Sequence, residues 1–129
     1  MEFNNNRLSL SLDPLDNTIT HDGHSYLIQS SNGNDPIGKG GNGLIYDLFN
    51  EEGENNLVIK ISKFHEGKSS DFIKTRLDRF QREIEALEKA RENELQNIVR
   101  LEFHGTLNAS SKVFPYYVMQ KCDCNLKEY

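Results

Sequence analysis

Cysteine is scarce in this sequence, and long apolar runs are absent from it. The two cysteines occur together, as Cys122-Asp123-Cys124. Cysteines this close rarely form a strain-free disulfide, and no further ligands at zinc-site spacing accompany them. We therefore expect two reduced thiols and no metal site. No apolar stretch approaches the length that spans a bilayer, which argues against a membrane partner.

An excess of basic residues is also lacking. The 129 residues carry 20 acidic and 15 basic side chains, for a formal net charge of −5. This balance disfavours a nucleic-acid partner. Residues 1–6 have neither the basic nor the apolar segment of a secretory signal, so we expect a cytoplasmic protein. The length fits one small domain.

Glycine, by contrast, is concentrated in one short run. The run reads Gly38, Lys39, Gly40, Gly41, Asn42 and Gly43. Glycines let backbone N–H groups approach phosphate oxygens, because no Cβ stands in the way. A tight hairpin also favours glycine, but a two-residue turn does not need so many. We therefore interpret this run as a phosphate-binding loop.

The residues after Gly43 distinguish two kinds of glycine loop. A dinucleotide-binding loop opens a helix, whose amino terminus meets the pyrophosphate. Here residues 44–49 are branched and aromatic, which predicts a strand. The turn-forming residues 50–56 then lead into a second predicted strand, 57–61, which contains Lys60. The pattern indicates a glycine loop on a β-hairpin and leaves a dinucleotide-dependent oxidoreductase as a minor alternative.

At these residues the chain resembles the amino-terminal lobe of protein kinases. The family pattern GxGxxGxV matches Gly38, Gly40, Gly43 and Ile45, and the V-A-I-K strand matches Leu57–Lys60. Further along, residues 80–87 resemble the helix whose glutamate, here Glu83, pairs with the lysine. Residues 97–101 resemble the fourth strand, and residues 117–123 resemble the fifth strand and the hinge between lobes.

Residues 69–91 carry the strongest helix signal. Apolar side chains recur there at spacings of four and three, at Ile73, Leu77, Phe80, Ile84 and Leu87. Ser69 or Ser70 is suited to cap the start of this helix. Glu83 lies at the edge of the apolar stripe, where it can face the strand that contains Lys60.

The resemblance implies a site for ATP. Lys60 would contact the α- and β-phosphates, and Glu83 would hold Lys60 in place. The implied adenine pocket consists of Ile37, Ile45, Val58 and Met119, with the backbone of Gln120 and Cys122 as hinge contacts. The alternative is that Lys60 and Glu83 are ordinary surface charges, but Lys60 interrupts an apolar run, which favours a functional role. On the sequence alone, the apolar residues are better explained as plain core.

The expected fold is α+β: a kinase-like lobe with a twisted antiparallel sheet of about five strands and one main helix. An Asp-Gly pair at positions 22–23 between two β-type runs predicts an additional amino-terminal hairpin. We divide the chain into an amino-terminal arm (1–16), the lobe (17–119), and the hinge with the start of a further helix (120–129).

Two kinase motifs do not occur in the sequence. H-R-D-x-x-x-x-N and D-F-G supply the catalytic base and the Mg²⁺ ligands from the carboxy-terminal lobe of the family. We therefore expect this chain to be the amino-terminal lobe of a serine/threonine kinase, and we expect it to be inactive on its own. The missing lobe would bind Mg²⁺ and the protein substrate. The alternative is a non-catalytic module that binds a partner or senses a nucleotide. An isolated lobe would expose an apolar cleft face, which favours self-association.

Overall fold

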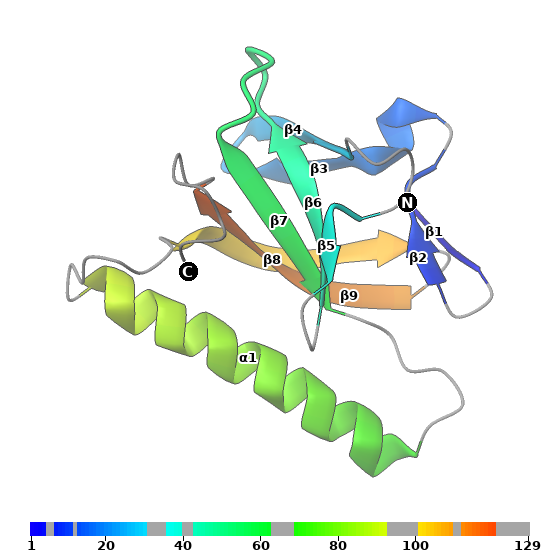
Figure 1. The fold of residues 1–129 in the computed structure, drawn as a ribbon, viewed down its shortest axis with the longest axis vertical. Helices are drawn as coiled ribbons and strands as arrows, with labels where there is room; N and C mark the ends of the chain where they lie inside the picture. The colour runs from blue at the N-terminus through cyan, green and yellow to red at the C-terminus, as the bar shows by residue number, and fades with distance from the viewer. Residues whose placement is uncertain are drawn as a thin grey trace.

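The computed structural model describes residues 1–4, 7–11, 13–30, 36–39, 43–62, 69–92, 101–109 and 112–120. Its elements are β1 (Glu2–Asn4), β2 (Arg7–Ser9), the 3₁₀ helix η1 (Pro14–Asn17), β3 (Thr18–His21), β4 (His24–Gln29), β5 (Gly38–Lys39), β6 (Gly43–Phe49), β7 (Leu57–Ser62), α1 (Ser70–Glu92), β8 (Leu101–Ala109) and β9 (Lys112–Gln120). Figure 1 shows α1 lying across one side of a strongly curled sheet.

The main sheet is antiparallel and has the order β3-β4-β6-β7-β9-β8, with β5 also paired to β6. The predicted amino-terminal hairpin is β3–β4. Its two turn residues, Asp22 and Gly23, have φ values of 54° and 79°, as a two-residue hairpin turn requires. The α+β prediction is confirmed. The sheet has more strands than expected because this hairpin joins it through β4 and β6.

One edge of β6 is shared by two short strands. β4 pairs with Asp47–Phe49 of β6, whereas β5 pairs with Leu44–Ile45. The sequence predicted irregular structure between these strands, and residues 31–35 lie outside the described part of the chain. The Ile37 N–H donates to the Ile45 carbonyl at 2.8 Å, which fixes the entry into β5. The first strand of the glycine hairpin is therefore only two residues long.

Side chains of the central strands alternate between two cores, because successive residues of a strand point to opposite faces. The inner core lies inside the curled sheet and contains Leu10, Ile19, Ile28, Tyr46, Leu48, Ile59, Ile61, Ala109, Phe114, Tyr116 and Val118. The helix-side core is smaller and contains Phe80, Ile84, Leu101 and Tyr117. Leu10, from the arm predicted at 1–16, is 7% exposed, so this part of the predicted arm packs into the domain.

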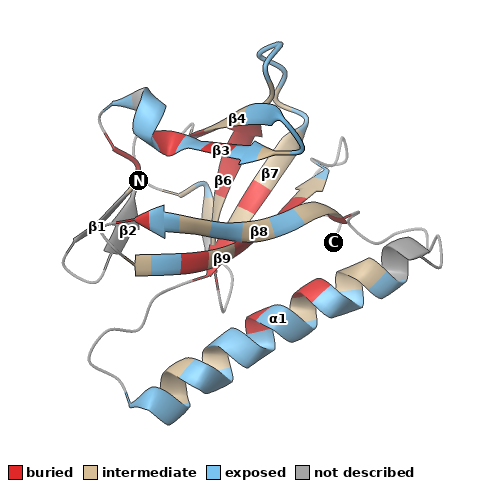
Figure 2. Ribbon diagram, turned by 180° about the vertical axis from the view of Figure 1, so that it is seen from behind, coloured by how far each residue is buried: buried red, intermediate tan, exposed pale blue. Residues whose placement is uncertain are grey.

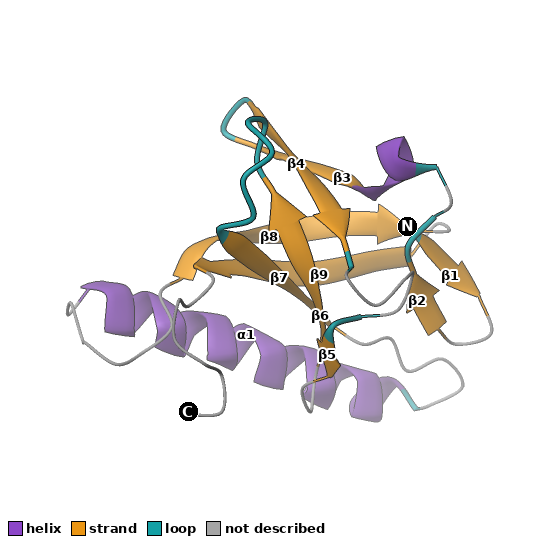
Figure 3. Cartoon of the chain, turned by 45° about the horizontal axis from the view of Figure 1, so that its top comes forward, coloured by secondary structure: helices purple, strands orange, loops and turns teal. Residues whose placement is uncertain are grey.

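The two outermost strands of the sheet, β3 and β8, contact each other through aromatic rings. The His21 ring on β3 stacks on the Phe103 ring of β8, with centroids 4.1 Å apart and planes 5° from parallel. Tyr26 on β4 adds a tilted contact to the same Phe103 ring at 5.2 Å. Figure 3 shows the curl that brings these strands together into a nearly closed barrel.

The predicted helix is confirmed and runs from Ser70 to Glu92. The Ser69 hydroxyl accepts from the Phe72 N–H at 3.2 Å, so Ser69 caps the first turn. The predicted apolar stripe packs unevenly: Phe80 and Ile84 are fully buried, but Leu77 is 41% exposed. Figure 2 shows buried positions only along the middle of α1, on the side facing the sheet.

The predicted strands are confirmed with small changes at their ends. The strands predicted at 44–49, 57–61 and 113–119 each extend by a residue or two, as β6, β7 and β9. Of the strand predicted at 97–101, the structure describes Leu101, which lies in β8, and this strand continues to Ala109. Residues 97–100 lie outside the described part of the chain.

Asn50 organises the turn between β6 and β7. Its side-chain oxygen accepts from the N–H groups of Glu52 at 3.1 Å and Glu54 at 2.8 Å. Asn50→Ala should lower the free energy of unfolding by about 1 kcal/mol, since both bonds are lost at an exposed turn. Urea unfolding measures this change. Asn56→Ala, at an exposed position of the same turn, should change it by less than about 0.5 kcal/mol; equal losses in the two variants would contradict the assignment.

Candidate functional site

The central pair of the candidate site joins β7 to α1. The Lys60 ammonium lies 2.7 Å from Glu83 Oε1, and the two side chains are 12% and 33% exposed, respectively. The sequence predicted that these two residues would meet, and the structure brings them together. The contact links the strand beside the glycine hairpin to the long helix.

The strand register explains why Lys60 points toward the helix. Lys60 is directly opposite Ile45 of β6 on one side and Tyr117 of β9 on the other. Directly opposed residues share a face of the sheet, and Tyr117 packs with Phe80 and Ile84 of α1 in the helix-side core. Lys60 and its two neighbours therefore lie on the face that α1 covers.

Tyr117 is a third member of the site that the sequence did not reveal. Its hydroxyl donates a short hydrogen bond to Glu83 Oε1, the same oxygen that contacts Lys60. Its ring packs against Phe80 with centroids 5.2 Å apart, and the Lys60 ammonium lies 5.7 Å from the ring centroid. The available signal was a tyrosine in an apolar strand, but its alignment with Lys60 needs the pairing of β7 with β9.

Burial raises the pKa of the Tyr117 hydroxyl far above its ordinary value of 10.0, and the hydrogen bond and negative charge of Glu83 raise it further. Both causes disfavour the phenolate, the first by removing water and the second by repulsion. Tyr117 therefore remains a hydrogen-bond donor throughout the neutral and mildly alkaline range.

This raised pKa predicts a loss of stability at alkaline pH. Above the ordinary value of 10.0, Tyr117 ionises in the unfolded chain but not in the folded protein, so the unfolded state binds fewer protons and stability falls as pH rises. The contribution is fully present below pH 10. Wild type should lose about 1 kcal/mol per pH unit more than Tyr117→Phe above that point, measured by urea unfolding. Identical slopes would contradict this account.

Gly43 allows β6 to begin directly against the lysine. A Cβ at this position would lie 2.8 Å from Lys60 Cγ and 2.9 Å from the Ile61 carbonyl oxygen. Because β6 rather than a helix starts at Gly43, the predicted glycine hairpin is confirmed, and the helix that a dinucleotide-binding loop opens does not follow this glycine. Gly38 and Gly43 flank the loop; the Lys39 side chain, Gly40, Gly41 and Asn42 lie outside the described part.

Apolar side chains continue the same face of the sheet beside Lys60. Val58 is directly opposite Met119, and Ile45 is directly opposite Lys60; all three apolar side chains are half-buried. The register therefore places Ile45, Val58 and Met119 together as predicted, and Ile37, which is 37% exposed, is hydrogen-bonded to Ile45 through the backbone. Cys122 lies outside the described residues.

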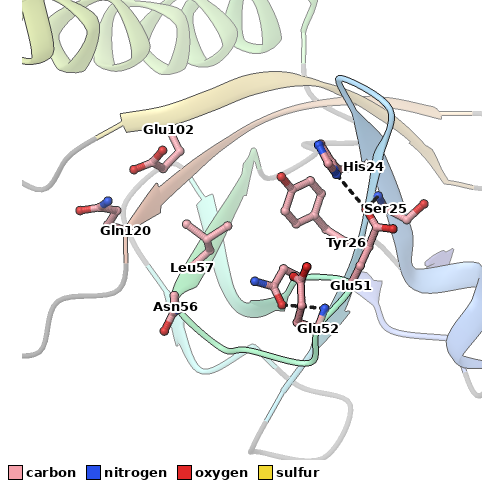
Figure 4. A pocket seen from close by; sticks show the side chains of 10 residues that line it. His24, Ser25, Tyr26, Glu51, Glu52, Asn56, Leu57, Glu102 and Gln120 are labelled. Carbon is pink, nitrogen blue, oxygen red and sulfur yellow. Dashed lines mark hydrogen bonds and ion pairs between the residues drawn. The ribbon is translucent and has the colours of Figure 1, made fainter.

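A polar cavity lies elsewhere in the domain. It has a volume of about 590 Å³ and is lined by His24, Ser25, Tyr26, Asn50, Glu51, Glu52, Asn56, Leu57, Glu102 and Gln120 (Figure 4). Leu57 and Gln120 pair with each other one position from Val58 and Met119, so their side chains point to the opposite face. The predicted role of Gln120 concerned its backbone carbonyl, which the direction of its side chain does not affect.

Within this polar cavity, Glu51 is held by its neighbours. Its Oε1 is 3.0 Å from the His24 ring nitrogen Nδ1 and accepts from the Ser25 N–H at 3.2 Å. These hydrogen bonds lower the pKa of the Glu51 carboxyl below its ordinary value, the contact with His24 contributing most. Because Glu51, Glu52 and Glu102 all line it, the cavity is acidic, which suits cations better than the phosphates of a nucleotide.

In the part of the chain that the structure describes, no group of three or more histidine, cysteine, aspartate or glutamate side chains is arranged to hold a metal ion. Across the same residues, no helix is both long enough and apolar enough to cross a bilayer.

Comparison of the sequence with models of known protein families gives no match, and a search of curated proteins gives none either. The functional conclusion therefore depends on the geometry of the Lys60 site.

Proposed function

We propose that this chain is the ATP-binding amino-terminal lobe of a protein kinase. The single observation that carries the proposal is the ion pair between Lys60 and Glu83, 2.7 Å long, beside the glycine hairpin. In protein kinases, a strand lysine contacts the nucleotide phosphates, and a helix glutamate holds that lysine in place. Here the strand is β7 and the helix is α1.

The chemistry of the Lys60 face suits a nucleotide in three ways. The ammonium has three donors, so it can bond phosphate oxygens while it contacts Glu83. Strand β6 begins at Gly43 against the alkyl chain of Lys60, which puts the Gly43 backbone close to the same charge. The half-buried side chains of Ile45, Val58 and Met119 offer an apolar surface to adenine.

Phosphoryl transfer needs groups that this sequence lacks. A base near the substrate hydroxyl and ligands for Mg²⁺ come, in the family, from the H-R-D and D-F-G motifs of the second lobe. We propose that such a lobe supplies them and binds the protein substrate, and that the whole enzyme transfers the γ-phosphate of ATP to serine or threonine. Lys60 and Glu83 would then be this chain's contribution to catalysis.

A nuclear magnetic resonance titration with Mg-ATP tests the proposal. We expect saturable binding with a dissociation constant on the order of 1 mM or tighter. The amide shifts should concentrate at Gly43, Ile45 and Lys60. Adenosine should bind more weakly, because it lacks the phosphates that Lys60 would contact. Absence of saturable binding, or shifts confined to the polar cavity around Glu51, would refute the proposal.

A further inference from the structure

We propose that Tyr117 is a positioning residue that keeps Glu83 engaged with Lys60 before any nucleotide binds. The inference rests on the proposed function in one respect, which is that Lys60 is the phosphate ligand. Tyr117 itself would touch neither nucleotide nor metal. It would act through Glu83 and so set how helix α1 sits on the sheet.

The first support is that side chains from two neighbouring strands donate hydrogen bonds to one carboxylate oxygen. Lys60 of β7 and Tyr117 of β9 are directly opposite each other, and both side chains reach Glu83 Oε1. A carboxylate oxygen can accept both bonds at once. Glu83 is therefore anchored to the sheet by a neutral donor as well as by the cation.

The second support is that Tyr117 holds α1 with its ring as well as its hydroxyl. The ring contacts Phe80, which is on the same helix one turn before Glu83. Both rings belong to the helix-side core, and Tyr117 is only 2% exposed. The hydroxyl thus has little access to water, whereas the Glu83 side chain, at 33% exposed, can turn to solvent once a donor is lost.

During nucleotide binding, the two donors to Glu83, Lys60 and Tyr117, would have different roles. Phosphate oxygens would share the Lys60 ammonium with Glu83 and draw it toward the nucleotide. While they do so, the Tyr117 hydroxyl would keep Glu83 in place, so that Lys60 stays oriented toward the phosphates. Loss of this hydroxyl should therefore weaken binding of phosphate groups and leave binding of the nucleoside unchanged.

Tyr117→Phe tests whether the Tyr117 hydroxyl supports phosphate binding, and Tyr116→Phe is a matched control. Tyr116 is the adjacent residue of β9, equally aromatic and 4% exposed, but it packs in the inner core on the opposite face. We expect Tyr117→Phe to raise the Mg-ATP dissociation constant about tenfold or more, as loss of a hydrogen bond to a charged group implies. Adenosine binding should change by less than about twofold. Tyr116→Phe should leave both constants within that limit.

A measurement without nucleotide separates this inference from the proposed function. Amide hydrogen exchange of helix residues 81–87 should become about tenfold faster in Tyr117→Phe and stay unchanged in Tyr116→Phe. If wild type binds no nucleotide, the proposed function fails, and faster exchange in Tyr117→Phe alone still supports the hold on Glu83. Unchanged exchange in that variant overturns the inference. So does an equal loss of Mg-ATP and adenosine affinity, which would show a general structural role.

Discussion

Replacement of Lys60 by methionine should weaken Mg-ATP binding by about a hundredfold or more. The change removes the positive charge that lies 2.7 Å from Glu83 and that we propose contacts the phosphates. Charge-assisted bonds to phosphate are among the strongest polar contacts, and losing about 3 kcal/mol corresponds to this factor. Methionine keeps an unbranched chain, so the contact with Gly43 is preserved. Isothermal titration calorimetry measures the affinity.

Two controls make the Lys60→Met result specific. Lys74→Met removes a lysine from an exposed position of α1 and should leave Mg-ATP affinity unchanged. Urea unfolding should show that Lys60→Met costs only about 1–2 kcal/mol, because Glu83 is partly exposed and keeps its Tyr117 donor. A folded Lys60→Met protein with wild-type affinity would show that Lys60 does not bind phosphate.

Gly43→Ala should be the second large effect, and its cause is lack of space. The new Cβ would lie 2.9 Å from the Ile61 carbonyl oxygen and 2.8 Å from Lys60 Cγ. The lysine chain can move aside, but the carbonyl cannot without a shift of β7. We expect a loss of about 2 kcal/mol in the free energy of unfolding. Because Lys60 is displaced as well, Mg-ATP affinity should fall more than about tenfold.

Gly38→Ala is the matched control for folding. A Cβ there would lie 3.6 Å from Ile45 Cδ1, which is ordinary van der Waals contact. Its stability should therefore stay within about 0.5 kcal/mol of wild type. The two alanine variants come from the same glycine run, so composition and helix propensity cannot account for a difference between them. Equal stability of Gly38→Ala and Gly43→Ala would contradict the account of close packing at β6.

Local patterns in the sequence predicted much of the fold. The Asp-Gly pair at 22–23 fixes its hairpin through two positive-φ backbone conformations, which these two residue types favour. The apolar stripe of α1 likewise follows from helical periodicity alone. The meeting of Lys60 with Glu83 is different, because Glu83 lies only at the edge of that stripe. Resemblance to a family predicted this contact, and periodicity did not.

The features that the sequence could not predict depend on pairing between distant segments. Tyr117 reaches Glu83 because β9 pairs with β7 in one register, and α1 and β8 lie between these strands in the chain. A shift by one residue would send the Tyr117 side chain to the inner core instead. The packing of Leu10 in the inner core also depends on distant strands.

The ring contacts between β3 and β8 give the curled sheet a seam. Stacked rings, such as His21 on Phe103, hold two surfaces together with less directional demand than a hydrogen-bonded ladder. Thermal opening should therefore begin at this seam and let water into the inner core from that side. Lys60 lies on β7, which is bonded on both edges to β6 and β9. Strand β7 and its Lys60 are thus held by hydrogen bonds on both edges and lie apart from these ring contacts.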